Sequence, residues 1–104
     1  MHTLQDLPAR EVMPGFQGKL IHSANMTFVF WEIDEGSLLP EHHHPHEQVA
    51  TVFEGQFEMT IDGRTEVLHP GTVTVIPSNA RHSGRALTKC RILDVFAPVR
   101  EDYR

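Results

Sequence analysis

Four of the eight histidines in this 104-residue chain lie between Gly36 and Gly55, within the sequence GSLLPEHHHPHEQVATVFEG. His42 and His44 are two residues apart, so on an extended segment their side chains leave the same face. Two imidazoles on one face at the end of a strand can bind the same ion. This spacing therefore indicates a metal site.

Gln48 and His82 are the predicted remaining ligands. After Pro45 the chain turns and resumes at Gln48, directly before an apolar run, so its amide can return toward the two imidazoles. His82 follows a second turn-rich segment, residues 77–80, and can complete the set from a neighbouring strand. We therefore predict one metal site with four ligands: His42, His44, Gln48 and His82.

The predicted ligands are all neutral. A divalent ion bound by three imidazoles and an amide keeps its full charge and can polarise an oxygen of a substrate. Nitrogen and oxygen ligands can bind manganese, iron, nickel, zinc or copper, so the sequence does not determine the identity of the metal. His43 and His46 are expected outside the site, because His43 points away from its neighbours and His46 follows the proline.

Composition limits the class of protein. A hydrophobic content of 39% and a charged content of 22% are typical of a soluble globular domain, and seven glycines with seven prolines indicate many turns. A net charge of −5 with only two lysines argues against nucleic acid as a partner. The single cysteine, Cys90, forbids an intrachain disulfide and fits a reducing compartment. Residues 1–15 lack the apolar core of a secretory signal and no stretch is long enough to span a bilayer, so we expect no membrane association and a cytoplasmic location.

Short strands separated by turns account for most of the chain. The runs that alternate, or that are rich in β-branched and aromatic residues, are 19–23, 25–34, 49–53, 56–62, 64–68, 72–76 and 90–96. Asp62-Gly63 predicts a tight hairpin between two of them. The pattern predicts an all-β sandwich or barrel over residues 18–104, preceded by an N-terminal arm over residues 1–17.

The spacing of glycines, histidines and prolines resembles the cupin superfamily. Its second motif is similar to residues 71–82, with Pro77 and Asn79 at the turn. The resemblance implies a double-stranded β-helix, or jelly-roll barrel, with the metal inside one end. Its first motif, a glycine, His-x-His, a further ligand and a second glycine, is matched by Gly36, His42, His44, Gln48 and Gly55.

Gln48 and the run DVFAPVRED, residues 94–102, resemble in particular the KdgF-type cupins of pectin and alginate degradation. This resemblance implies an enzyme that converts 4,5-unsaturated monouronates into linear keto-uronates, with a small anionic sugar as substrate. It also implies that Asp94, Phe96 and Arg100 form the working face beside the metal.

These three residues suit the implied chemistry. Asp94 shares a strand face with Phe96, and a carboxyl on a buried face is a candidate shuttle for the proton that ketonises the ring carbon and opens the ring. Arg100, aimed by Pro98, is expected to bind the uronate carboxylate, and Phe96 to offer a flat wall to the sugar. Each has a plainer alternative: Asp94 pairs outside the barrel with an arginine such as Arg91, Arg100 caps a strand end, and Phe96 only fills the core.

Two other functions remain open from the sequence. One is a cupin dioxygenase, which needs a redox metal and oxygen, and the other is a sugar-binding cupin without turnover. Because a small barrel has strand edges that need covering, we expect a homodimer in which residues 1–17 cross to the partner and complete its sheet.

Overall fold

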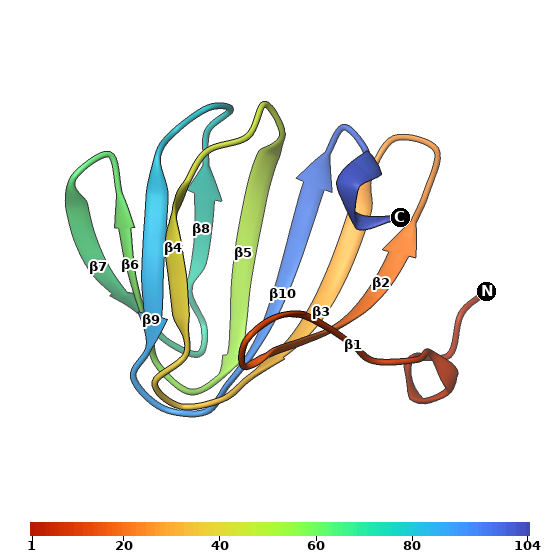
Figure 1. Ribbon diagram of the computed structural model, residues 1–104, viewed down its shortest axis with the longest axis horizontal. Helices are drawn as coiled ribbons and strands as arrows, with labels where there is room; N and C mark the ends of the chain where they lie inside the picture. The colour runs from red at the N-terminus through yellow and green to blue at the C-terminus, as the bar shows by residue number, and fades with distance from the viewer.

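Ten strands form two antiparallel sheets in the computed structural model, which describes residues 1–104 (Figure 1). The larger sheet has the order β1-β2-β3-β10-β5-β8 and the smaller sheet the order β4-β9-β6-β7. Two 3-10 turns, η1 (Leu4–Asp6) and η2 (Glu101–Tyr103), lie near the termini. The strands are β1 (Arg10–Met13), β2 (Phe16–His22), β3 (Thr27–Ile33), β4 (Leu38–His42), β5 (Glu47–Glu54), β6 (Phe57–Ile61), β7 (Arg64–Leu68), β8 (Val73–Ile76), β9 (His82–Ala86) and β10 (Cys90–Ala97). The predicted all-β jelly-roll fold is confirmed.

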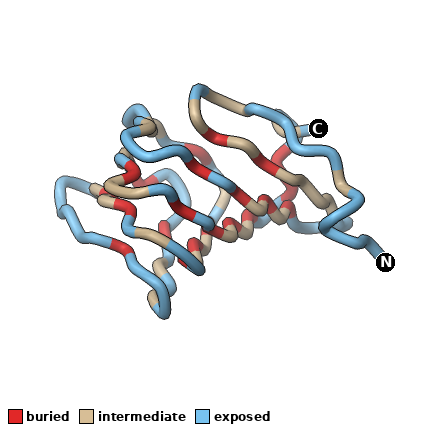
Figure 2. The backbone as a smooth tube through the Cα atoms, turned by 90° about the horizontal axis from the view of Figure 1, so that it is seen from below, coloured by how far each residue is buried: buried red, intermediate tan, exposed pale blue.

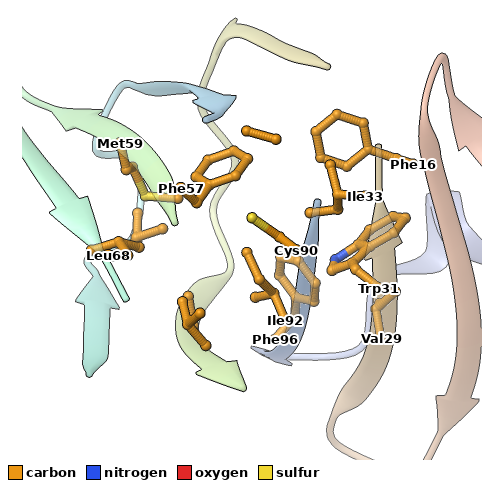
Figure 3. Packing of buried hydrophobic residues seen from close by; sticks show 14 of the residues in the cluster. Phe16, Val29, Trp31, Ile33, Phe57, Met59, Leu68, Cys90, Ile92 and Phe96 are labelled. Atoms are coloured by element: carbon orange, nitrogen blue, oxygen red, sulfur yellow. The ribbon is translucent and has the colours of Figure 1, made fainter. Parts of the chain in front are cut away.

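The core lies between the two sheets because alternate residues of each strand point inward. In Figure 2 buried positions alternate with more exposed ones along the strands, as the period of two requires. β3, within the predicted run 25–34, buries Val29, Trp31 and Ile33 on one face. Around them aromatic rings meet edge to face: the Phe16 ring lies 5.8 Å from that of Trp31 and 6.5 Å from that of Phe57 (Figure 3).

Two turns that contain glycine connect β5 to β6 and β6 to β7. Asp62 and Gly63 have φ of 47° and 82° and join β6 to β7, which confirms the predicted hairpin. Gly55, which ends the first cupin-like motif, also has a positive φ, and a Cβ there would collide with the carbonyl of Lys89. Only glycine therefore fits in the turn between β5 and β6.

Apart from β4, which the His-x-His spacing indicates, the structure has two strands that the sequence pattern does not predict. β9 occupies a stretch expected as a loop, and its Gly84 packs against the Phe57 ring in the space where a side chain would begin. β1 lies in the segment expected as an arm and pairs with β2 of the same chain, with Arg10 opposite Gly18. Residue 17, the predicted boundary between arm and barrel, lies within β2. The domain boundary and the exchange of residues 1–17 with a partner stay predictions.

Candidate metal and active site

Three histidines meet between the two sheets at one end of the barrel. His42 ends β4 and His82 begins β9, and the two residues lie opposite each other in the strand register. His44 follows in the loop between β4 and β5. One ring nitrogen from each of the three residues lies within 4.8 Å of those of the other two. A single ion can therefore reach all three rings.

Main-chain carbonyls determine which ring nitrogen of each histidine is free. The Nδ1 atoms of His42, His44 and His82 lie 2.8, 3.0 and 2.9 Å from carbonyl oxygens two residues away. Since a carbonyl only accepts, each Nδ1 carries the proton and each Nε2 holds a lone pair. The Nε2 of His82 is buried and has no hydrogen-bond partner. Such a nitrogen is satisfied by a metal ion, so the donor set fits one.

Gln48 brings an oxygen to the same cluster. It lies on β5 opposite Phe96 of β10 and is 4% exposed. Its Oε1 lies 3.1 Å from the Nε2 of His44. With the Nδ1 of His44 protonated, both atoms of this contact carry lone pairs, so the contact is favourable when a cation lies beside them. All four residues predicted as ligands are thus brought together.

Burial keeps His44 and His82 neutral. It is the largest cause that lowers the pKa of His82 to about 4; the hydrogen bond to the Ala80 carbonyl opposes it, and electrostatic repulsion from the neighbouring basic groups, including Arg100, adds to it. Burial and the Arg100 charge likewise lower the pKa of His44. At neutral pH both rings are uncharged, which is the form that binds a metal ion.

Asp94 points into the barrel from β10. Its Oδ2 accepts a hydrogen bond of 2.8 Å from Nε1 of Trp31, whereas its Oδ1 is buried and without a well-formed hydrogen bond. Burial raises the pKa of Asp94 to about 6, against the opposing effects of the Gln48 amide, the Trp31 indole and the Arg100 guanidinium. The alternative in which Asp94 faces solvent is excluded by its 9% exposure.

This buried carboxyl makes stability depend on pH in an unusual direction. The pKa of Asp94 is about 6 in the folded protein and about 4 in an unfolded chain. The folded state binds the proton more tightly, so the contribution of Asp94 to the free energy of unfolding falls as pH rises between these values. The free energy of unfolding of Asp94→Asn minus that of wild type is therefore expected to increase by about 3 kcal/mol when the pH is raised from acidic to neutral.

Urea denaturation of the metal-free proteins at several pH values measures this difference. Other titrating groups, including His82, are common to both proteins and cancel in the comparison. A difference between the two proteins that is the same at every pH would mean that Asp94 titrates alike in the folded and unfolded states.

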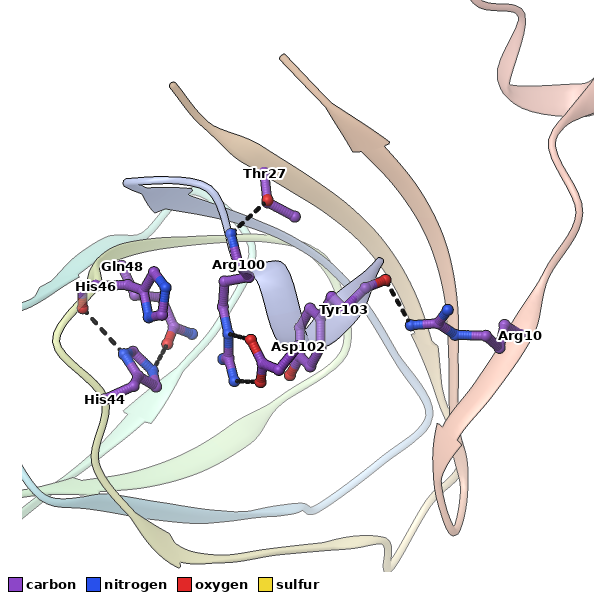
Figure 4. Close-up of polar contacts among 8 residues, drawn as sticks. All are labelled: Arg10, Thr27, His44, His46, Gln48, Arg100, Asp102 and Tyr103. Carbon is purple, nitrogen blue, oxygen red and sulfur yellow. Dashed lines mark hydrogen bonds and ion pairs between the residues drawn. The ribbon is translucent and has the colours of Figure 1, made fainter. Parts of the chain in front are cut away.

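Arg100 is buried beside the cluster and does not cap a strand end at the surface. Its Nε and Nη2 donate to the two carboxylate oxygens of Asp102 at 3.1 and 2.6 Å (Figure 4). Its Cζ lies 4.9 Å from the centre of the Phe96 ring and 4.0 Å from that of Tyr103. The guanidinium thus lies against two mutually perpendicular rings, each at cation–π distance.

Phe96 belongs to both the core and the site. It is 2% exposed and packs in the hydrophobic cluster, and its ring lies 5.6 Å from that of His44. A single pocket is lined by the metal-site residues His42, Gln48 and His82, by Asp94, Phe96 and Arg100, and by Trp31 and Tyr103 among others. The residues predicted as metal ligands and as the working face therefore adjoin one pocket, although His44 itself does not line it.

Three residues of the site are absent from the sequence prediction. Trp31 is the hydrogen-bond partner of Asp94, while Asp102 and Tyr103 pair and stack with Arg100. The acidic residue two positions after Arg100 is the only sequence signal for this pair. His43 is exposed and His46 lies with its ring 5.5 Å from that of His44, and neither belongs to the cluster of ligand atoms.

Comparison with known proteins agrees with this geometry. A family model described as a cupin domain matches residues 29–96. The pectin degradation protein KdgF of Dickeya dadantii (strain 3937) is 30% identical over 101 residues, which cover 94% of this chain and 92% of that protein. No helix of the structure has the length and hydropathy needed to cross a membrane.

Two solved structures superimpose over nearly the whole chain. KdgF from Halomonas sp. matches with a TM-score of 0.92 and 30% identity, covering 98% of this chain and 96% of that one. An RmlC-like cupin from Shewanella frigidimarina matches with a TM-score of 0.95 and 26% identity, covering 100% and 95% of the two chains. The second match covers the whole chain and therefore includes every residue that lines the pocket.

Proposed function

The chain belongs to the cupin family, and from this premise and its similarity to KdgF we propose that it is a metal-dependent enzyme that converts 4,5-unsaturated monouronates into linear keto-uronates. One observation carries the proposal: Asp94 is a buried carboxyl with an unbonded oxygen, in a pocket shared with the histidine cluster. Burying a carboxyl without full hydrogen bonding costs stability, and sugar binding alone does not require it. Proton transfer does require such a carboxyl, because it needs a group whose pKa lies near the working pH.

We assign the metal to His42, His44, Gln48 and His82. Because these ligands are uncharged, a divalent ion bound there would retain its full charge and supply Lewis-acid polarisation of a substrate oxygen. The lone pairs on the Nε2 atoms and on the Gln48 oxygen support this assignment. The donor set is compatible with manganese, iron, nickel, zinc or copper.

The reaction moves two protons within the substrate and neither consumes nor releases a proton overall. In a 4,5-unsaturated uronate the ring oxygen belongs to an enol ether. Ring opening moves the proton of the anomeric hydroxyl to that oxygen and breaks its bond to C1, which leaves an aldehyde and an enol. Ketonisation then moves the enol proton to C4.

Asp94 is suited to both movements. A carboxyl with a pKa of about 6 accepts and returns a proton near neutral pH. Trp31 holds its Oδ2, which leaves Oδ1 as the oxygen that exchanges the proton with the substrate. Phe96 would flank the sugar ring, and Arg100 would bind the substrate carboxylate through Nη1, the nitrogen not engaged by Asp102.

Product analysis distinguishes this function from its alternatives. Metal-loaded protein is incubated with the unsaturated monouronate, and the product is identified by NMR while oxygen is monitored. A linear keto-uronate formed without oxygen consumption is expected. Oxygen consumption would instead identify a dioxygenase, and saturable binding without product would identify a sugar-binding protein.

We also propose that the protein is a homodimer, assembled through the outer face of the larger sheet. Two adjacent rows of this face carry a single charged residue between them, and Val73 and Val75 are 63% and 55% exposed. An apolar face without charges at its centre fits a second copy of itself. The rows, which cross β2, β3, β10, β5 and β8, are Ile21, Phe28, Val95, Val49, Val75 and Lys19, Phe30, Leu93, Thr51, Val73.

Val75→Glu is expected to convert the dimer into a monomer, because it places a charge in this apolar face. Sedimentation velocity across a range of concentrations measures the mass. Val67→Glu is the matched control, since Val67 is 44% exposed on β7 of the other sheet. A wild-type protein that is monomeric at every concentration would contradict the dimer.

The cytoplasmic location stays a prediction.

A further inference from the structure

Arg100 is held by several groups at once. The rings of Phe96 and Tyr103 lie against its guanidinium, and its main-chain N–H donates to the Oγ1 of the fully buried Thr27 at 2.9 Å. Asp102 occupies the edge formed by Nε and Nη2 (Figure 4). Nη1 has no protein partner, and it is absent from the buried atoms that lack one, so it reaches open space. One donor nitrogen is therefore left for a ligand.

The burial of the two partners is unequal. The Arg100 side chain is 9% exposed, whereas that of Asp102 is 56% exposed. An ion pair with so exposed a partner adds little to stability, because solvent screens it. A bidentate carboxylate nevertheless fixes both the position and the rotation of a guanidinium. The pair is thus better suited to orienting Arg100 than to stabilising the fold.

The turn that carries Asp102 is itself tied to the sheet. The main-chain carbonyl of Tyr103 accepts a hydrogen bond of 2.8 Å from Nη2 of Arg10 on β1. The Tyr103 ring packs edge to face against Trp31 and Phe96, at 6.4 and 5.8 Å between centres. The C-terminal turn η2 is therefore docked against the pocket through β1 and the aromatic core.

We propose that Asp102 is a positioning residue for substrate binding: it holds the Nε and Nη2 edge of Arg100 so that Nη1 is presented to the carboxylate of the sugar acid. The proposal rests on the proposed function for the class of ligand. Without Asp102 no side chain fixes the rotation of the guanidinium, and a ligand carboxylate has to order it on binding.

Binding of a saturated sugar acid tests this role separately from turnover. D-galacturonate has no enol ether, so it cannot undergo the proposed reaction, and its methyl ester lacks the charge. Isothermal titration of both compounds is compared for wild type, Asp102→Asn, Asp102→Glu and Glu101→Gln, with the metal content of each protein measured. Glu101→Gln is the matched control, since Glu101 is an exposed acid of the same turn that pairs with Arg104.

Wild type is expected to bind the acid more tightly than the ester. Asp102→Asn should weaken binding of the acid about tenfold and leave the ester unchanged, which is the loss expected for one charge-assisted hydrogen bond. Asp102→Glu should restore most of the affinity, because the exposed side chain has room for a longer acid. Glu101→Gln should bind both compounds as wild type does.

Three outcomes would overturn the proposal. Equal losses for acid and ester in Asp102→Asn would show a merely structural role. Unchanged binding of the acid by this variant would show that Asp102 has no part in binding, and tighter binding would show that it competes with the ligand for Arg100. A wild-type protein that does not prefer the acid would remove Arg100 as the carboxylate site, whether or not the unsaturated substrate is turned over.

Discussion

Asp94→Asn is expected to lower kcat on a 4,5-unsaturated monouronate by about 10³-fold with its metal content unchanged. A positioned acid or base contributes roughly 10² to 10⁴ to a rate, and Asn cannot exchange a proton in this range. The substitution preserves shape, because an amide oxygen can still accept the 2.8 Å hydrogen bond from Trp31. Steady-state kinetics together with metal analysis of the same samples measure the effect.

Glu66→Gln is a suitable control, because Glu66 is an exposed acid on β7 that does not itself line the pocket. Its kcat should equal that of wild type. If Asp94→Asn retained wild-type kcat, Asp94 would have no part in proton transfer. If it lost its metal together with activity, Asp94 would instead support the metal site.

His82→Ala is expected to lower metal affinity by at least about 100-fold. Even partners that only orient a ligand change metal affinity by roughly 10- to 100-fold, and His82 offers the Nε2 atom itself. That atom is buried and unbonded, while Nδ1 is held by the Ala80 carbonyl at 2.9 Å. Competition with a metal-binding dye, using zinc as the probe ion, gives the affinities of wild type and variant.

His43→Ala is the matched control for this change. His43 lies between two residues of the cluster in sequence but is exposed, so its removal should leave the zinc affinity unchanged. Equal loss of affinity in both variants would place the ion elsewhere in the HHHPH segment. Retention of affinity in His82→Ala would exclude β9 as a source of a ligand.

Local sequence pattern predicts the inner face of this barrel well. The alternation along residues 90–96 places Asp94 and Phe96 on one face, and both are buried there. His42 and His82 converge because they lie opposite each other on β4 and β9, whereas His44 comes from the loop after β4 and not from the expected strand; this loop and β5 bring His44 and Gln48 beside them. The predicted resemblance to cupins is confirmed by the match to residues 29–96.

The features that sequence could not predict depend on contacts between distant residues. Trp31 and Asp94 are 63 positions apart, and nothing local to either one specifies their hydrogen bond. Gly84 lies in a strand because the Phe57 ring fills the place of a side chain, which is a tertiary effect. The pair of Asp102 and Arg100 is an exception, since the two residues are neighbours in sequence; it depends on the local 3-10 turn η2, and short 3-10 turns have no periodic signal.

The most direct test of ring opening at this site is the decay of ultraviolet absorbance of a 4,5-unsaturated monouronate. The rate is measured with metal-loaded wild type, with metal-stripped wild type and with metal-loaded Asp94→Asn, each against the spontaneous rate. We expect acceleration only with metal-loaded wild type, and recovery of activity when metal is restored to the stripped protein. Decay at the spontaneous rate with metal-loaded wild type, on substrates derived from both galacturonate and guluronate, would contradict the proposed function.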